Sequence, residues 1–277
     1  MKDLRGKVVV ITGGGSGIGR ATSLQLGREG ATVAVADLRK DSAEQTVADI
    51  VAAGGQASAH GVDVTSDTEF EALRDAVLEQ HGVVDVVINN AGIAVETIPT
   101  VDTSLEIFRK VLDVNLWGVI HGTKTFLPHL LSRPSANLVN TCSFAGLMGM
   151  TEMSPYNVSK FGVRGLTEAL QMEFNKSSLT VTLVCPGGTR TPLMTNSPTV
   201  AEANKKALTD NLMKSKSAKP PEYVAACIVA GIKKDKHRVL AGPDTVVIDK
   251  IVRLLPGSYP RIMAPQLKKL LDKTLNN

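Results

Sequence analysis

The sequence predicts an α/β fold in which helices cover both faces of a parallel sheet. Short runs of β-branched residues alternate with longer helical segments almost from the first residue, which implies right-handed βαβ crossovers. Aromatic residues make up only 4% of the chain, as is typical of aliphatic strands buried on both faces. A chain of 277 residues can bury such a core without a metal or a disulfide. The sequence shows no internal repeat, linker or second domain.

The expected elements follow one another in regular alternation. Strands are expected at residues 7–12, 32–36, 57–62, 84–88, 137–141, 179–184 and 238–240. Helices are expected at residues 18–29, 41–53, 67–81, 104–131 and 155–175, and Pro220 and Pro221 open a further helix. Gly30 and the pair Gly54-Gly55 end the first two helices. Residues 195–219 form a polar stretch rich in serine, threonine, asparagine and lysine.

A glycine-rich turn joins the first strand to the first helix. Glycine is needed where the backbone turns sharply or must approach a pyrophosphate without a Cβ in the way. The start of the following helix offers free N–H groups and the positive end of its dipole to phosphates. We therefore expect a dinucleotide to bind at Gly13, Ser16, Gly17, Ile18 and Gly19.

Asp37 ends the second strand, where an acid in a dinucleotide-binding fold hydrogen-bonds the adenosine ribose hydroxyls. The same carboxylate would repel a 2′-phosphate, so it favours NAD over NADP. Arg39 could instead turn toward a 2′-phosphate, which keeps NADP open. A plainer interpretation makes Asp37 a helix cap or a turn residue.

Tyr156 and Lys160 are candidates for acid/base chemistry. Their spacing of four places both side chains on one face of a helix, one turn apart. A lysine charge close to a tyrosine favours tyrosinate and lowers the tyrosine pKa, as a general acid/base requires. Ser143 follows the fifth strand, at the end of a parallel strand where ligands bind. Asn115 lies in an apolar helical run, where its amide should have a partner.

Taken in order, these residues resemble the motifs of the short-chain dehydrogenase/reductase family over nearly the whole chain. The motifs are T-G-x-x-x-G-x-G at Thr12–Gly19, D-V at Asp63-Val64, N-N-A-G at Asn89–Gly92, Asn115, Ser143, Y-x-x-x-K at Tyr156–Lys160, and P-G at Pro186-Gly187 followed by Thr191. One such motif would be weak, whereas the ordered set is specific. The resemblance implies a single Rossmann-type doubly wound sheet with strand order 3-2-1-4-5-6-7.

The resemblance also implies a role for each catalytic residue. Tyr156 would exchange a proton with the oxygen of an alcohol or ketone. Lys160 would hold the nicotinamide ribose and lower the pKa of Tyr156. Ser143 would hydrogen-bond the substrate oxygen, and Asn115 would hold a water in a proton relay. The expected reaction is therefore hydride transfer between a nicotinamide and a secondary alcohol or ketone.

The remaining motif residues are implied to bind the cofactor. Asp63 and Val64 would flank the adenine. Asn89, Ala91 and Gly92 would line the cofactor cleft. Pro186, Gly187, Thr189 and Thr191 would hold the nicotinamide amide side, while Tyr156 and Lys160 contribute to both sets.

Charge and composition limit the other function classes. The net charge of +4 is modest, and no aromatic residues interleave the basic C-terminal segment, so a nucleic-acid role has little support. Three cysteines and five histidines show no metal-ligand spacing, so no metal is expected. No secretory signal opens the chain and no apolar run could span a bilayer, which predicts a cytoplasmic protein.

The C-terminal third of the chain is expected to contain the segment that covers the substrate and a helical extension. We expect residues 1–243 to form the dinucleotide-binding and catalytic domain, with a substrate lid at about residues 192–219. Methionines and leucines there and between Ser143 and Tyr156 favour a lipophilic substrate over a sugar, although several could simply pack in the core. Residues 244–277 read as a basic amphipathic extension, similar to those of hydroxysteroid- and retinol-type members. Packing on the chain itself or on a second subunit is favoured over peripheral membrane contact.

Two other functions stay open. An NADP-dependent carbonyl or 3-oxoacyl reductase is the alternative enzyme, and Asp37 argues against it. A dinucleotide-binding protein without turnover is the alternative from another class, and the presence of Asn115, Ser143, Tyr156 and Lys160 together argues against that. The resemblance further implies a dimer or tetramer in which the two long helices pair.

Overall fold

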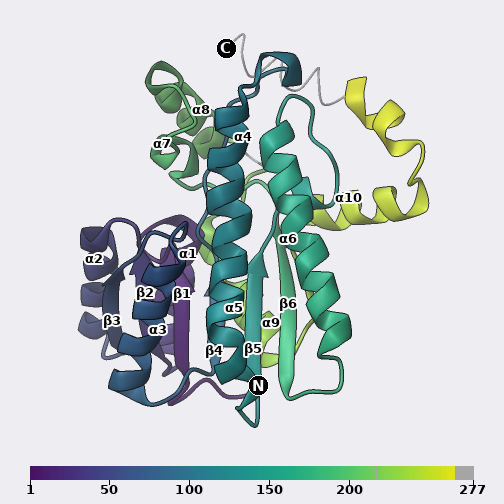
Figure 1. Ribbon diagram of the computed structural model, residues 1–277. Coiled ribbons are helices and arrows are strands. Elements are labelled where there is room, and N and C mark those ends of the chain that lie inside the picture. Colours follow the sequence, from purple (N-terminus) through teal and green to yellow (C-terminus); the bar gives the residue numbers. More distant parts are fainter. Residues whose placement is uncertain (216, 266–277) are drawn as a thin grey trace.

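The strands form the doubly wound parallel sheet expected from the sequence. The computed structural model describes residues 1–215 and 217–265, and within them one sheet has the order β3-β2-β1-β4-β5-β6-β7 (Figure 1). The strands are β1 (Val8–Thr12), β2 (Thr32–Asp37), β3 (Gln56–Gly61), β4 (Val86–Asn89), β5 (Ala136–Thr141), β6 (Leu179–Pro186) and β7 (Arg238–Ala241). The order reverses between β1 and β4, so the loops after these two strands diverge and leave a crevice at the carboxyl edge.

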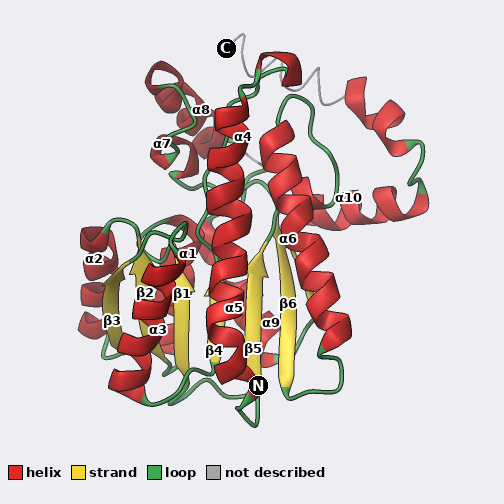
Figure 2. Ribbon diagram, viewed as in Figure 1, coloured by secondary structure: helices red, strands yellow, loops and turns green. Residues whose placement is uncertain are grey.

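Helices pack on both faces of this sheet (Figure 2). One face carries α1 (Gly17–Arg28), α2 (Lys40–Ala52) and α9 (Pro221–Lys233), and the other carries α3 (Asp67–His81), α5 (Gly118–Leu131) and α6 (Ser154–Glu173). Helix α4 (Leu105–Leu112) lies above the carboxyl edge of the sheet, in line with α5 (Figure 1). Leu26, Ile50 and Ile228 belong to the core on the first face. Phe70 and Phe126 belong to the core on the second. Burial on both faces explains why central strands such as β1, with the sequence VVVIT, are almost entirely aliphatic.

The long helix expected at residues 104–131 differs from the prediction in one respect. Its two halves, α4 and α5, are joined by a π-helical turn at Asp113–Trp117. Such a turn inserts one extra residue into the helical ladder. Asn115 lies in the turn, fully buried, and its amide bonds the backbone of Ile93. Periodicity alone could not locate the turn because the partner of Asn115 lies on another loop.

The polar stretch expected to form a lid contains two helices, α7 (Leu193–Asn196) and α8 (Glu202–Lys214). They lie above the carboxyl edge of the sheet, at the upper left of Figure 1. Glu96, on the loop after β4, holds the start of α8. Its Oε1 accepts hydrogen bonds from the Ala201 N–H at 2.7 Å and from Asn204 Nδ2 at 3.1 Å. A cap supplied from so distant a loop leaves no local signal in the sequence.

The expected C-terminal extension begins with α10 (Pro243–Leu254), and residues 259–265 are helical as well. In Figure 1 this segment, coloured yellow, leaves β7 and lies beside the upper part of α6. The basic residues Lys268, Lys269 and Lys273 of the expected amphipathic extension lie outside the described residues. Other strand and helix bounds agree with the expected ranges to within two residues.

Candidate active site

The carboxyl edge of the sheet opens into a cavity of about 800 Å³. Most of the predicted site residues line it: Gly13, Ser16, Gly17, Ile18, Gly19, Asp37, Asp63, Val64, Ala91, Gly92, Ser143, Tyr156, Lys160, Pro186, Gly187, Thr189 and Thr191. Two predicted residues, Asn89 and Asn115, are buried behind the wall instead of lining it. The fold therefore brings residues from six different loops to one hollow.

The phosphate loop, Thr12–Gly19, has the geometry that a pyrophosphate cradle needs. Gly13 and Gly17 have φ angles of +64° and +52°, in the region that favours glycine. A Cβ on Gly19 would lie 2.0 Å from the Gly13 carbonyl oxygen, and one on Gly13 would lie 2.9 Å from Ala91 Cα. Side chains at these places would clash with the backbone of the loop itself and of Ala91, so the tight turn requires glycine. The N–H groups at the start of α1 lie where they can meet an anion.

Asp37 connects the end of β2 to the phosphate loop. Its Oδ2 accepts a hydrogen bond from the Gly15 N–H at 2.9 Å, and its Oδ1 accepts one from the Arg39 N–H at 3.1 Å. Asp37 therefore stabilises a turn, as the plainer interpretation expected, and its side chain also lines the cavity. The guanidinium of Arg39 donates from Nη1 to Asn196 Oδ1 of α7 at 3.3 Å.

The two asparagines at the end of β4, Asn89 and Asn90, lie differently from the expectation. Asn89 was expected to line the cofactor cleft, but its Nδ2 donates to Asn140 Oδ1 at 2.9 Å inside the core. Asn90 lines the cavity, and its Nδ2 donates to the carbonyl of Thr12 at 3.0 Å. Because side chains alternate along a strand, one step in register exchanges the two roles. The same alternation could have identified Asn90 as the cavity residue.

Asp63 and Val64 form a fixed turn beside the cavity. Asp63 Oδ1 accepts hydrogen bonds from the Thr65 N–H at 2.9 Å and from Thr65 Oγ1 at 2.8 Å. The Val64 carbonyl lies 3.1 Å from Nδ1 of His121. These bonds fix the backbone that would flank an adenine, and that role stays a prediction.

Tyr156, Lys160 and Ser143 meet at one wall of the cavity. Tyr156 and Lys160 lie one turn apart on α6, and Lys160 Nζ is 5.7 Å from the centroid of the Tyr156 ring. Lys160 is buried and donates from Nζ to the carbonyl of Thr141 at 3.1 Å. Ser143 Oγ accepts from the Ala145 N–H at 3.2 Å. Phenol, ammonium and hydroxyl groups in this arrangement can hold an oxygen and exchange its proton.

The pKa of Tyr156 moves in the direction opposite to the expectation. Lys160 was expected to lower it, but burial raises the pKa of Tyr156 to about 12, and a hydrogen bond with Ser143 only partly opposes that change. Burial also lowers the pKa of Lys160, because desolvation disfavours its charged form. The phenol is therefore protonated at neutral pH, the state from which it can donate a proton.

Asn115 does not line the cavity, but its hydrogen bonds hold two parts of the cavity wall together. Its Oδ1 accepts from the Ile93 N–H at 2.8 Å, and its Nδ2 donates to the Ile93 carbonyl at 3.0 Å and to Ser159 Oγ at 3.3 Å. These bonds tie the loop after β4 to α6 next to Lys160. The contacts support a positioning role, and the proton relay through a water stays a prediction.

The Pro186–Thr191 turn after β6 closes another side of the cavity. Thr189 Oγ1 donates to the Gly187 carbonyl at 2.9 Å, and the Lys219 N–H donates to the Gly188 carbonyl at 2.8 Å. A Cβ on Gly17 would lie 3.2 Å from Thr191, so this turn approaches the phosphate loop closely. The loop expected to hold the pyrophosphate and the turn expected to hold the nicotinamide therefore share one cavity.

Apolar side chains make up the wall next to Tyr156 and under the lid. They are Phe144, Met150, Met153, Leu193, Met194 and Leu212. Two methionines expected to contribute do not line the cavity. Met148 is buried in the protein and Met213 is half-exposed on α8. The remaining apolar surface suits a ligand with few polar groups.

The described residues also bear on metal binding and on membrane insertion. Among them, no group of three or more histidine, cysteine, aspartate or glutamate side chains is placed to hold a metal ion. Within the same ranges, no helix combines the length and the apolar character needed to cross a membrane.

The chain is similar to known proteins in sequence and in fold. The family model described as short chain dehydrogenase matches residues 7–201. A putative oxidoreductase, SadH, of Mycobacterium tuberculosis (strain ATCC 25618 / H37Rv) is 36% identical over 272 residues, 97% of this chain and 98% of that protein. The 3beta-hydroxysteroid dehydrogenase 1 of Eggerthella lenta is 35% identical over 258 residues, 92% of this chain and 97% of that protein. The crystal structure of a short chain dehydrogenase/reductase from Burkholderia phymatum in complex with NAD has a TM-score of 0.83 at 29% identity, covering 91% of this chain and 95% of that one.

Proposed function

The chain belongs to the short-chain dehydrogenase family and is a nicotinamide-dependent oxidoreductase of alcohols and ketones, and we propose that it uses NAD with a lipophilic secondary alcohol or ketone. The observation that carries the proposal is the meeting of Tyr156, Lys160 and Ser143 at the wall of a cavity that is otherwise largely apolar.

The phosphate loop fits a dinucleotide on its own geometry. Gly13 and Gly19 stand where a Cβ would clash with neighbouring backbone, so the loop can keep its tight turn, and α1 begins at Gly17. When bound, the nicotinamide would accept or donate the hydride. We assign the Pro186–Thr191 turn and Lys160 to hold its end of the dinucleotide.

Tyr156 would move the proton of the reaction. In ketone reduction its phenol donates the proton to the substrate oxygen, and in alcohol oxidation the tyrosinate takes the proton back. Ser143 would orient the substrate oxygen toward Tyr156. The buried ammonium of Lys160 would stabilise the tyrosinate that forms, since an opposite charge close by favours the ionised phenol.

NAD is favoured over NADP by the surroundings of Asp37. Its carboxylate lines the cavity beside the phosphate loop, where it would accept hydrogen bonds from ribose hydroxyls and repel a 2′-phosphate. Arg39, the residue that could favour NADP, is hydrogen-bonded to Asn196 of the lid. The NADP-dependent reductase remains the second candidate because Arg39 also lines the cavity.

A second copy of the chain is the expected partner. Large apolar side chains are exposed along the two long helices, with Leu105 and Trp117 on the α4–α5 helix and Val158 and Phe161 on α6. Exposed apolar surface of this kind marks association sites. We therefore propose a homo-oligomer in which these helices pair.

The substrate proposal is tested by steady-state kinetics with NAD and two kinds of secondary alcohol. We expect kcat/KM for cyclohexanol or a 3-hydroxysteroid to exceed that for a polyol such as sorbitol by about 10²-fold or more, because the apolar wall leaves additional hydroxyls without partners. Equal or better turnover of the polyol would contradict the proposed substrate class.

A further inference from the structure

Asp244, on α10, contacts a loop of the candidate site. It lies in the first turn of α10, and its Oδ2 accepts a hydrogen bond from the Gly188 N–H at 3.1 Å. Gly188 belongs to the Pro186–Thr191 turn and lines the cavity. The Asp244 carboxylate therefore links the start of the C-terminal segment to the site.

Two glycines next to Asp244 leave room for its carboxylate because they carry no side chain. The three atoms nearest to a Cβ built on Gly187 would all belong to the Asp244 side chain, the closest being Oδ2 at 2.1 Å. On Gly242, which precedes α10, a Cβ would lie 2.2 Å from Asp244 Oδ1. Gly188 is different, because a Cβ there would meet only Ala218, at 3.8 Å. Gly187 is thus required for the approach of Asp244.

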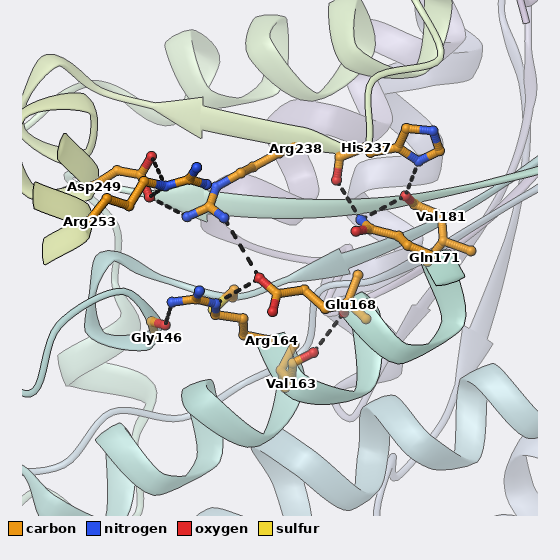
Figure 3. A network of polar contacts seen from close by, with 12 residues as sticks. Gly146, Val163, Arg164, Glu168, Gln171, Val181, His237, Arg238, Asp249 and Arg253 are labelled. Carbon is orange, nitrogen blue, oxygen red and sulfur yellow. Dashed lines mark hydrogen bonds and ion pairs between the residues drawn. The ribbon is translucent and has the colours of Figure 1, made fainter. Parts of the chain in front are cut away.

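Charged contacts hold the middle of α10 against the rest of the protein (Figure 3). Asp249 of α10 pairs with Nη2 of Arg238 in β7, and Arg253 Nε lies 3.1 Å from the same carboxylate. Arg238 extends the contact to α6, where its Nη1 lies 3.7 Å from Glu168 Oε1. Arg238 and Asp249 are both largely buried, so this one pair is better shielded from solvent than an exposed ion pair.

The same network continues to the loop after Ser143. Glu168 Oε1 accepts from Arg164 Nε at 2.8 Å, and Arg164 Nη1 donates to the Gly146 carbonyl at 3.4 Å (Figure 3). Helix α10 is therefore joined to the helix that carries Tyr156 and to the turn that follows Ser143. A carboxylate on a helix held in this way can act as a fixed support for a loop.

We propose that Asp244 is a positioning residue that sets the backbone of the Pro186–Gly188 segment for binding of the nicotinamide end of the cofactor. The proposal rests on the proposed function, because that segment is assigned there to the cofactor. It gives the C-terminal extension a role inside its own chain: α10 supports the site from behind the Pro186–Thr191 turn.

The first test is the affinity of three variants for NADH, measured by fluorescence titration. Asp244→Ala removes the acceptor of the Gly188 N–H, and we expect the Kd for NADH to rise about tenfold. Asp244→Asn keeps an oxygen acceptor and should stay within about threefold of the wild type. Glu222→Ala is the matched control, because Glu222 is an exposed acid in the first turn of α9, and it should change nothing.

Two further readouts separate positioning from loss of stability. At saturating NAD, the KM of Asp244→Ala for the alcohol should change less than about twofold, because the substrate wall is intact. Hydrogen exchange of the Gly188 amide, measured without cofactor, should become at least about tenfold faster in Asp244→Ala and stay near wild type in Asp244→Asn.

A double-mutant cycle on the cofactor-free protein tests the contact itself. Gly187→Ala should lower Tm by roughly 5 °C in the wild-type background, because its Cβ meets the Asp244 carboxylate. In the Asp244→Ala background the same change should lower Tm much less. Gly188→Ala is the control and should be tolerated in both backgrounds.

NADH affinity that Asp244→Ala leaves unchanged would overturn the positioning role alone. A Gly187→Ala cost that is equal in both backgrounds would overturn the contact on which the role depends. A wild-type protein that binds neither NADH nor NADPH would refute the proposed function and this proposal together.

Discussion

Two loops of the cavity are supported in the same way, by an aspartate that accepts a hydrogen bond from a glycine N–H. In the phosphate loop, Asp37 Oδ2 accepts from Gly15 at 2.9 Å. In the Pro186–Thr191 turn, Asp244 Oδ2 accepts from Gly188 at 3.1 Å. Each carboxylate also crowds a glycine, since a Cβ on Gly15 would lie 2.9 Å from Asp37 and one on Gly187 would lie 2.1 Å from Asp244.

The two supports differ in where they come from. Asp37 ends β2, whose neighbour β1 leads directly into the phosphate loop, so sheet register alone brings the two together. Asp244 comes from a helix after the last strand, and its partner belongs to the loop after β6. The adenosine side is thus built within one βαβ unit, whereas the nicotinamide side depends on a segment added after the sheet is complete.

The largest expected effect is on kcat, and it distinguishes proton transfer from cofactor binding on the nicotinamide side. Tyr156→Phe removes the hydroxyl that exchanges the proton, and we expect kcat to fall by about 10²–10⁴-fold while NADH affinity is retained. Steady-state rates and a fluorescence titration measure the two quantities. Tyr223→Phe is the matched control, because that half-exposed tyrosine lies outside the cavity wall. Near-full activity of Tyr156→Phe would remove the catalytic assignment.

The next largest expected effect is a change in cofactor preference, caused by substitutions on the adenosine side. Asp37→Ala combined with Leu38→Arg removes the charge that repels a 2′-phosphate and adds one that attracts it, since Leu38 is exposed at the cavity. We expect the ratio of NADPH to NADH affinity to rise by about 10–100-fold. Asp244→Ala should instead weaken both cofactors by the same factor.

The control for that comparison is Asp41→Ala, which removes an exposed acid from the first turn of α2. It should leave the ratio of affinities unchanged. If Asp37→Ala with Leu38→Arg also leaves the ratio unchanged, Asp37 is a turn residue only and the two supports do not differ in function.

The smallest expected effect is a shift in the pH at which the Tyr156 phenol ionises. Burial raises the pKa of Tyr156 to about 12, above the value near 10 of an unfolded tyrosine. Because the folded pKa is the higher one, the contribution of Tyr156 to stability is present below about pH 10 and is lost as the pH rises toward 12. The difference in phenolate absorbance between the wild type and Tyr156→Phe isolates this group. A midpoint below pH 10 would show that Lys160 outweighs burial.

The sequence predicts best what depends on neighbours along the chain. Strand and helix bounds follow from β-branched runs and apolar periodicity, and the motif residues reach one cavity because parallel strands end at one edge. The assignment of Asn89 to the cofactor cleft was off by one residue in register, since Asn90 lines the cavity. It could have been avoided by following the alternation of β4.

Features that depend on distant partners were not predictable in this way. The π-helical turn at Asn115 follows from a contact with Ile93, and α8 starts where Glu96 caps it from another loop. The pKa of Tyr156 depends on how deeply the fold buries the phenol, which a spacing of four residues cannot show. Asp244 follows a glycine and a proline at an ordinary helix start, and nothing local indicates its contact with Gly188.

The most direct test of the central claim is a fluorescence titration of the wild-type protein with NADH and, separately, with NADPH. The arrangement of Asp37 beside the phosphate loop predicts that NADH binds more tightly, by about tenfold or more. Tighter binding of NADPH would contradict the account, since Arg39 would then have to leave Asn196 and meet the 2′-phosphate.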